Sequence, residues 1–315
     1  MVQHYYRYVK SFIKLLVSGG LIYFLYVKLD NPEIRNVFLS LDARVVLLCV
    51  SVLALLLALQ GYRWNVVAQG LRVSVSMKES IALSFIGALF SQVLPSSAGG
   101  DGIRVYRLFH SGFPLSLSFN SVLIDRIIAL VGLVLLSAIG FGLLGWSNMP
   151  VRLLAALGVF AAVIISGIAV LLCLDRIPLP GRVAKLHIVR KAMHISAHAR
   201  SIFLHPLIVL ITISISIVIH VGVSGVFWLF GSQLGLNADF LMCVAIVPLV
   251  TLATVIPISV AGWGVREGAM VLAFSAIGGS STAAMLASVL LGLAAACASI
   301  PGILFWHNAP NKPHS

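Results

Sequence analysis

The chain has 315 residues, of which 60% are hydrophobic and only 10% are charged, and its mean hydropathy is +1.08. A soluble domain carries about 25% charged residues, and a water-soluble core of this size could not bury so much apolar surface. The formal net charge of +12 would suit nucleic-acid binding, but the basic residues flank apolar stretches, as the positive-inside rule requires. We therefore expect an integral membrane protein with no nucleic-acid partner.

The first apolar stretch, 11–29, follows Arg7, Lys10 and Lys14 and superficially resembles a signal peptide. No small-x-small cleavage site follows it, so we expect it to persist as the first membrane anchor. Further apolar runs are long enough, at about 1.5 Å per residue, to cross a hydrocarbon core of roughly 30 Å. They cover residues 45–68, 115–145, 151–174, 206–230 and 281–306.

Two other apolar segments, 79–94 and 240–257, behave differently. Each runs into a proline and a Gly-rich stretch, after which a second short apolar piece begins, at 103–113 and 266–279. Proline and glycine interrupt helices, and such broken elements are typical of re-entrant or discontinuous helices in transporters.

Lys and Arg in short connections predict the orientation of the chain. We expect the basic N-terminus and the basic connections to be cytoplasmic, and the connections without Lys or Arg to face the other side. The basic connections are 63–78 and 175–205, and those without Lys or Arg are 146–150 and 231–239. This assignment is self-consistent only if 79–113 enters and leaves from the cytoplasmic side and 240–279 from the opposite side.

We therefore predict one integral membrane domain over 1–315 in the inner (cytoplasmic) membrane, with a first repeat half at about 45–174 and a second at about 206–306. The fold class is all-α, a polytopic transmembrane helix bundle with two inverted repeats, each containing a broken or re-entrant helix. Between the halves lies the basic cytoplasmic loop 175–205, where a helix is expected to lie in the interface beside anionic lipids.

No metal or other cofactor is expected. His194 and His198 have the i, i+4 spacing of a metal pair, but no Glu or Cys stands nearby to complete a site. The cysteines lie in apolar stretches with no CxxC spacing, so we expect them to be small core residues. They are Cys49, Cys173, Cys243 and Cys297.

The most informative feature is an internal repeat. Residues 95–104 read PSSAGGDGIR, and residues 257–266 read PISVAGWGVR. Pro, Ser, Gly, Gly and Arg coincide without a gap, and Arg104 and Arg266 lie 162 residues apart. A pseudo-two-fold axis in the membrane plane is the simplest explanation.

The repeated segment suits an anion. Glycines permit positive φ and allow backbone N–H groups to turn toward a bound group, and the short helix that follows presents its positive N-terminal end. Arg104 and Arg266 can each hold a phosphate with paired hydrogen bonds, and Arg107 would share the face of Arg104. Alternatively, the glycines only allow close helix packing and the arginines extend to the headgroups.

Charged residues at membrane depth usually face a partner or a water-filled cavity. Asp101, Asp125, Arg126 and Glu267 are such residues. Asp125 could pair with an arginine of the first loop or carry a coupling proton, and a static ion pair that fixes the fold is equally compatible with the sequence. The candidate substrate-binding residues are Gln92, Ser96, Ser97, Gly100, Asp101, Gly102, Arg104, Arg107, Asp125, Arg126, Ser259, Gly262, Trp263, Gly264, Arg266 and Glu267.

Three of these motifs, in this order, resemble the lysylphosphatidylglycerol synthase transmembrane-region family. They are the run Leu94–Arg104, the pair Asp125-Arg126 and the run Gly262–Glu267, and the likeness covers roughly 10–306. The resemblance implies a flippase-like membrane domain that handles lipid headgroups in the cytoplasmic membrane. The synthases of that family continue into a soluble aminoacyl-transfer domain, and because this sequence ends at Ser315, lysine transfer is not expected.

The sequence leaves three functions open. The first is a translocator of an anionic lipid or lipid-linked substrate, of phospholipid, polyprenyl-phosphate or hopanoid type. The second is an intramembrane lipid-modifying enzyme that uses Asp101, Asp125 or Glu267 as a base, although no known catalytic motif supports it. The third is an accessory subunit that partners a lipid or glycan biosynthesis enzyme. We expect no enzymatic activity.

Overall fold

The computed structural model describes residues 41–93, 99–176, 187–255 and 263–308, and within these ranges every regular element is helical. Five helical segments there are long and apolar enough to cross a membrane. They are α3 (Ala43–Gly70), α6 (Leu115–Leu144), α7 (Val151–Cys173) with its short continuation to Arg176, α10 (Pro206–Gln233), and α13 (Ser281–Ser299) with α14 (Pro301–Asn308). These segments confirm five of the predicted spans, and the predicted anchor 11–29 lies outside the described residues.

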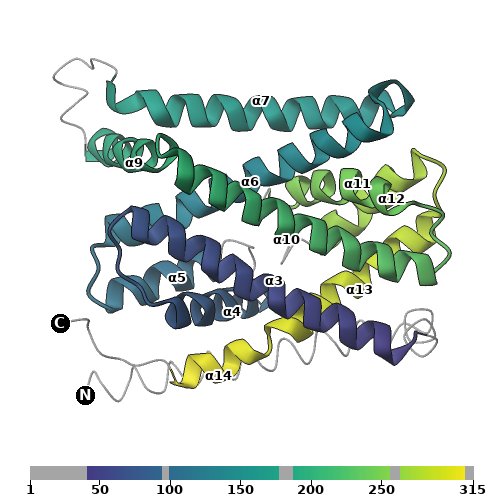
Figure 1. Ribbon diagram of the computed structural model, residues 1–315, viewed down its shortest axis with the longest axis horizontal. Coiled ribbons are helices and arrows are strands. Elements are labelled where there is room, and N and C mark those ends of the chain that lie inside the picture. Colours follow the sequence, from purple (N-terminus) through teal and green to yellow (C-terminus); the bar gives the residue numbers. More distant parts are fainter. Residues whose placement is uncertain (1–40, 94–98, 177–186, 256–262, 309–315) are drawn as a thin grey trace.

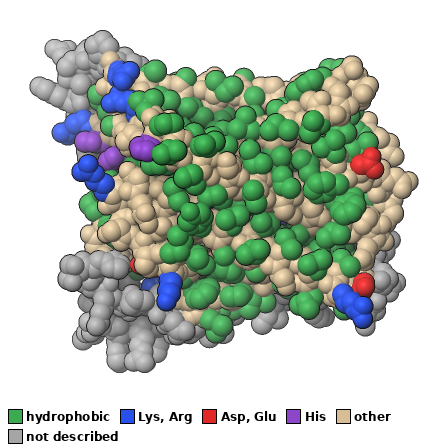
Figure 2. All heavy atoms as spheres, in the orientation of Figure 1, with side chains coloured by type: hydrophobic (Ala, Val, Ile, Leu, Met, Phe, Trp, Pro, Cys, Tyr) green, Lys and Arg blue, Asp and Glu red, His purple; other side chains and the backbone are tan. Residues whose placement is uncertain are grey.

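The lengths of these segments match the bilayer. They run for 26 to 30 residues, or about 39 to 45 Å at 1.5 Å per residue, which exceeds the hydrocarbon core and allows for tilt. The face shown in Figure 2 is apolar over its centre, while the His side chains and most Lys and Arg side chains lie toward its left edge, where α9 (His187–Phe203) lies in Figure 1. The surface is that of a protein solvated by lipid.

Four shorter helices lie between the long ones. They are α4 (Met77–Val93), α5 (Gly99–His110), α11 (Phe240–Ala253) and α12 (Val265–Ser275). Each has fewer than the roughly 20 residues that a crossing needs. The predicted breaks fall on the segments that join α4 to α5 and α11 to α12, and the prolines there lie outside the described residues. In Figure 1 α4 and α5 lie in the left half of the bundle, and α11 and α12 lie in the right half.

The short helices α4 and α11 each pack against two of the long helical segments. α4 packs against α3 and α14, and α11 packs against α10 and α6. Close approach depends on small residues, as is common between membrane helices. A Cβ on Gly140 of α6 would stand 2.7 Å from the Ala245 backbone of α11, and a Cβ on Gly302 of α14 would stand 2.6 Å from the Phe85 carbonyl of α4.

The helix α9 confirms that the basic loop contains a helix, and its place in the membrane interface stays a prediction. Its buried side includes Ala199 and Ile202, and Ser196 donates to the Leu171 carbonyl at the end of α7. Arg200 lies 2.6 Å from Asp175. These contacts fix one side of α9 to the bundle and leave His194 on the exposed side.

The expectation for the cysteines was half right. Cys49 and Cys243 are buried, but Cys173 and Cys297 are exposed. In a membrane the outer surface is as apolar as the core, because both contact hydrocarbon. Hydrophobic context alone therefore did not separate core positions from lipid-facing ones.

Candidate ligand site at the centre of the first half

The site is built around Asp125, which lies in the first half of α6 and is fully buried. Its Oδ1 accepts from Arg63 Nε of α3 at 2.8 Å, and its Oδ2 lies 3.5 Å from the Arg104 guanidinium of α5. Arg63 also donates through Nη1 to Ser216 Oγ of α10 at 2.9 Å. One buried carboxylate therefore joins α3, α5 and α6, and Arg63 extends the network to α10.

Arg104 is held on several sides. Its side chain is 2% exposed, and its guanidinium lies over the Trp64 ring at 4.4 Å, a cation–π contact that strengthens when water is excluded. The guanidinium lies 3.5 Å from the Asp101 carboxylate. α5 can approach α4 this closely because Gly100 has no side chain, since a Cβ there would overlap the Gly87 carbonyl oxygen.

Arg126 lies at the open edge of the site. Its Nε donates to Asp101 Oδ2, and its side chain is 42% exposed. Unlike Arg63 and Arg104, it can therefore meet an incoming group.

A cavity of about 220 Å³ lies beside these charges, with room for several water molecules at about 30 Å³ each. Two buried polar atoms at this cavity, Ser84 Oγ and Arg104 Nε, have no hydrogen-bond partner among the described residues. Buried donors without partners are uncommon and indicate a missing water, ion or ligand. The lining residues are Gln60, Ser84, Gly87, Ala88, Ser91, Gln92, Asp101, Arg104 and Arg126.

The charges around this cavity do not cancel. The guanidinium groups of Arg63, Arg104 and Arg126 give three positive charges, and Asp101 and Asp125 give two negative ones. Each carboxylate lies within 3.5 Å of two guanidinium groups. One positive charge therefore remains without a counter-charge in the network.

The matching segment of the second half forms a separate group of contacts. Arg266 Nη2 lies 2.7 Å from Glu267 Oε1, Arg266 Nε donates to Ser288 Oγ at 3.1 Å, and its guanidinium lies 4.8 Å from the Trp263 ring centre. Glu267 also accepts from the backbone N–H of Gly264. A carboxylate of the chain itself therefore meets the N-terminus of α12, where an anionic ligand was expected.

The structure corrects the predicted role of two glycines and agrees with that of a third. Gly264 has φ of +83°, as expected for the residue before a helix. Gly100 and Gly102 instead lie within α5 and are absent from the residues with positive φ. The helix begins four residues earlier than the apolar pattern indicated, so these two glycines do not form a turn around a ligand.

Arg107 does not join the cavity, contrary to expectation. Its Nη2 donates to the Trp306 carbonyl at 3.3 Å, and its guanidinium lies 4.2 Å from the centre of the Trp306 ring in α14. The i, i+3 spacing places it near Arg104 on α5, but α14 offers both a carbonyl and an aromatic face. Arg107 therefore fixes α14 to α5.

The remaining predicted site residues either lie at the cavity or fall outside the described residues. Gln92, Asp101, Arg104 and Arg126 line the cavity, and Asp125 supports it. The other predicted residues, Ser96, Ser97, Ser259 and Gly262, lie outside the described residues.

Several residues of the charged networks and of the cavity were not predicted from the sequence. Arg63 was counted with a basic connection, but it lies inside α3 and is 2% exposed. The signal was available, since Arg63 and Trp64 interrupt an apolar run well before that helix ends. Gln60, Ser84, Ser216 and Ser288 carry no such signal, because single polar residues are common in membrane helices.

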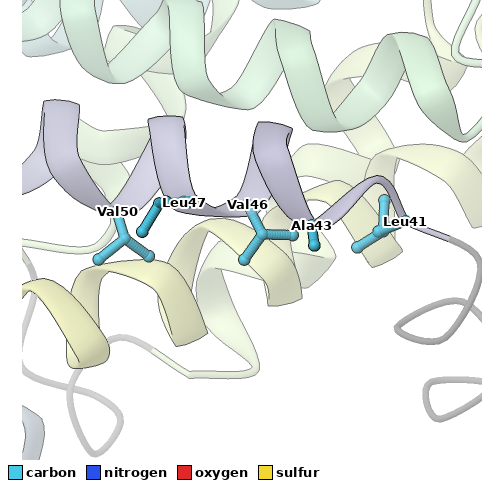
Figure 3. A pocket seen from close by; sticks show the side chains of 5 residues that line it. All are labelled: Leu41, Ala43, Val46, Leu47 and Val50. Carbon is cyan, nitrogen blue, oxygen red and sulfur yellow. The ribbon is translucent and has the colours of Figure 1, made fainter.

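A second hollow contrasts with the polar cavity. It has a volume of about 420 Å³ and is lined by side chains at the start of α3, Leu41, Ala43, Val46, Leu47 and Val50. Figure 3 shows these side chains along one side of α3. With an entirely apolar lining, this hollow suits hydrocarbon and offers no group to recognise a headgroup.

Taken together, the long apolar helices and the charged network define a polytopic integral membrane protein with a polar site inside its bundle. The family model for the lysylphosphatidylglycerol synthase transmembrane region matches residues 11–302, and the chain belongs to this family. The family is a membrane domain associated with lipid handling. Searches of curated proteins and of solved structures gave no significant match.

Proposed function

We propose that this protein is a flippase-like translocator that carries the headgroup of an anionic lipid, or of a lipid-linked substrate, across the membrane. The observation that carries the proposal is the cavity beside Arg104 and Arg126, whose charged network has one more arginine than carboxylates among the described residues. A buried positive charge without a counter-charge is costly. An anionic headgroup would supply the missing charge while its chains stay in the bilayer.

The recurrence of elements supports an inverted repeat, which gives such a site access to both leaflets. The order α3, α4, α5, α6 is followed by α10, α11, α12 and α13 with α14, and α3 and α10 both have 28 residues. Gly140, where α6 meets α11, and Gly302, where α14 meets α4, are 162 residues apart. This is the spacing between Arg104 and Arg266. In Figure 1, α3 and α10 begin at opposite ends of the bundle.

The proposed mechanism is a rocking of the two halves about the site. α4 with α5, and α11 with α12, would be re-entrant pairs that meet near the centre from opposite sides. Figure 2 supports a cytoplasmic left edge, because the His side chains and most of the basic side chains on the face shown lie toward it, while the basic side chain at the lower right stands beside an acidic one. The headgroup would bind at Arg126 from one side and leave from the other after the halves move.

The direct test is lipid exchange in liposomes that contain the purified protein. A fluorescent anionic phospholipid, quenched only in the outer leaflet by a membrane-impermeant reductant, reports movement between leaflets. We expect exchange with the wild-type protein and strongly reduced exchange with Arg126→Gln, while Arg152→Gln, at an exposed position of α7, serves as the matched control. Wild-type exchange no faster than in protein-free liposomes would contradict the proposal.

The carboxylates do not favour the alternative of an enzyme. Asp101, Asp125 and Glu267 each lie in an ion pair with arginine, so each already accepts from a charged donor of the chain itself. Chromatography of the lipids recovered from the same liposomes tests this expectation, because an enzyme would leave a chemically changed lipid.

A further inference from the structure

His220 of α10 is a titratable side chain inside the bundle that does not line the cavity. Its Nε2 atom is buried and has no hydrogen-bond partner among the described residues. The other ring nitrogen, Nδ1, bonds to the backbone of Ala129 in α6, where the carbonyl is the available group because a helix interior already uses its N–H groups. A carbonyl only accepts, so in the neutral ring Nδ1 carries the proton and Nε2 presents a lone pair to the bundle.

His220 belongs to a row of polar residues along one face of α10. Thr212, Ser216 and Ser224 recur with it at intervals of four residues, and these three are 0% exposed. Each hydroxyl donates to the carbonyl four residues earlier, and its oxygen can still accept. From Thr212 to Ser224 the row extends about 18 Å at 1.5 Å per residue, more than half of a hydrocarbon core. The helix therefore offers a polar group on each turn across much of the membrane.

This polar row also contacts the charged network of the first half. Arg63 donates to Ser216 Oγ at 2.9 Å, four residues before His220, and its guanidinium is close enough to act electrostatically on the imidazole. The same arginine binds Asp125 at 2.8 Å. His220 therefore lies beside the group that joins α3, α6 and α10.

Few other ionisable groups face His220. The buried charged or titratable side chains on the elements that pack against α10 are Cys49 and Arg63 of α3, Asp125 of α6 and Cys243 of α11. Arg126 of α6 is 42% exposed and pairs with Asp101, and Tyr62 of α3 and Cys297 of α13 are exposed. The basic helix α9 lies at the left edge in Figures 1 and 2. Arg63 is therefore the cation that a charged imidazole would meet.

A proton on Nε2 would place a second positive charge beside Arg63. The network around Arg63 already has one more arginine than carboxylates among the described residues, and like charges repel strongly where water is scarce. Proton binding therefore opposes the arrangement of Arg63 between Ser216 and Asp125. Because Arg63 joins helices of both halves, a proton on His220 and the packing of the halves are linked.

We propose that His220 is a proton-binding site that couples movement of the headgroup to movement of a proton. Nε2 takes a proton from water on one side of the membrane in one arrangement of the halves, and the imidazolium returns it to water on the other side after they move. Ionisable residues at membrane depth commonly serve as such relays. The proposal rests on the proposed function and deepens it, because it names the energy source.

A pH gradient across liposomes tests the coupling, because a coupled translocator accumulates its substrate and a passive one cannot. The full chain is reconstituted with a trace of the fluorescent anionic phospholipid, the outside pH is held constant, and potassium with valinomycin removes the membrane potential. At a gradient of about one pH unit, one proton per headgroup gives at most about a tenfold ratio of lipid between the leaflets. We expect a ratio of severalfold with the wild-type protein, and equal leaflets would overturn the proposal.

His220→Asn separates the proton site from the contact with α6. The amide nitrogen of asparagine can still donate to the Ala129 carbonyl, but nothing replaces Nε2, so the lipid should stay equally distributed under the same gradient. Exchange without a gradient is measured in parallel, so that an inactive variant is not mistaken for an uncoupled one. His205→Gln, at an exposed position just before α10, is the matched control and should accumulate lipid as the wild type does. Accumulation that persists in His220→Asn would overturn the proposal, and the wild-type result can do so by itself even if this variant does not fold.

The outcomes separate this proposal from the proposed function. Rapid exchange with equal leaflets under the gradient would leave translocation intact and overturn the coupling. Absence of exchange in the wild type, with or without the gradient, would contradict translocation and the coupling with it.

Discussion

At the scale of single residues, Asp125 is the group on which the charged network depends most. It is fully buried and lies against two arginines that are each 2% exposed. Removing one partner of a buried ion pair leaves an uncompensated charge, which costs more than the intact pair contributes. The stability of the fold and the charge of the site are therefore set by the same contacts.

A double-mutant cycle measures this dependence. Asp125→Ala should lower the free energy of unfolding by about 3–5 kcal/mol, because Arg63 loses its partner in the buried network, and Arg63→Ala should also destabilise. The double substitution should cost less than the sum of the two single changes. Unfolding in mild detergent, followed by tryptophan fluorescence, provides the measurement, and additive costs would contradict direct coupling.

Gly100 and Gly102 make a matched pair of tests. A Cβ at Gly100 would overlap the Gly87 carbonyl oxygen, while a Cβ at Gly102 would meet nothing within 4 Å. Gly100→Ala should therefore lower the free energy of unfolding by about 1–3 kcal/mol, and Gly102→Ala should stay within about 0.5 kcal/mol of wild type or stabilise α5. Equal effects on thermal unfolding would mean that α4 and α5 are not packed as described.

At the scale of elements, α9 connects the basic edge of the molecule to the bundle. Asn120 of α6 lies 2.6 Å from His198 Nδ1, a distance at which the amide can donate to a neutral imidazole. Burial, and in addition the neighbouring His194, lower the pKa of His198 below its ordinary value of 6.5. The docked helix therefore favours the neutral imidazole.

This shift predicts how stability depends on pH. Above pH 6.5 both the folded and the unfolded states hold His198 neutral, so the folded state loses nothing. As the pH falls below 6.5 toward the lowered pKa, the unfolded state binds the proton first and stability decreases. The melting temperature of wild type should fall more between pH 8 and pH 5 than that of His198→Gln, and parallel decreases would contradict this role.

Elements differ in how well their sequence predicts them. Five spans followed from hydropathy, because length and apolar character alone decide whether a helix can cross a bilayer. The start of α5 did not, because Gly99, Gly100 and Gly102 suggest a turn locally, whereas all three lie in the helix and Gly100 packs against α4. The sequence left open a pairing of Asp125 with an arginine of the first loop, and the structure pairs Asp125 with Arg63, which lies 62 positions away.

At the scale of the whole molecule, the proposed inverted arrangement can be tested by labelling. Lys78 at the start of α4 and Asp239 just before α11 are both exposed. Single cysteines at these positions, in a background without Cys173 and Cys297, should react with a membrane-impermeant maleimide from opposite sides of sealed vesicles. Labelling of both from one side would contradict the inverted repeat.

The candidate site was only partly predictable from the sequence, because the partners of its arginines come from distant parts of the chain. The repeat predicted equivalent roles for Arg104 and Arg266, but the partners that make the sites differ lie elsewhere in the chain. Arg104 meets Asp125, whereas Arg266 pairs with its own neighbour Glu267. A local motif predicted where the cations are and could not predict their counter-charges.

The helix α7 stands apart, because it lies between the two recurring sets and few of its residues are buried. Its presence changes the number of membrane crossings that precede α10 from even to odd. If α4 with α5 does not cross, α3 and α6 make two crossings, and a copy of the set placed directly after them would start on the original side. α7 adds a third crossing, so the chain reaches α10 on the side opposite to the one where α3 began. A duplicated gene segment can then give a second set of opposite direction, as α3 and α10 have in Figure 1.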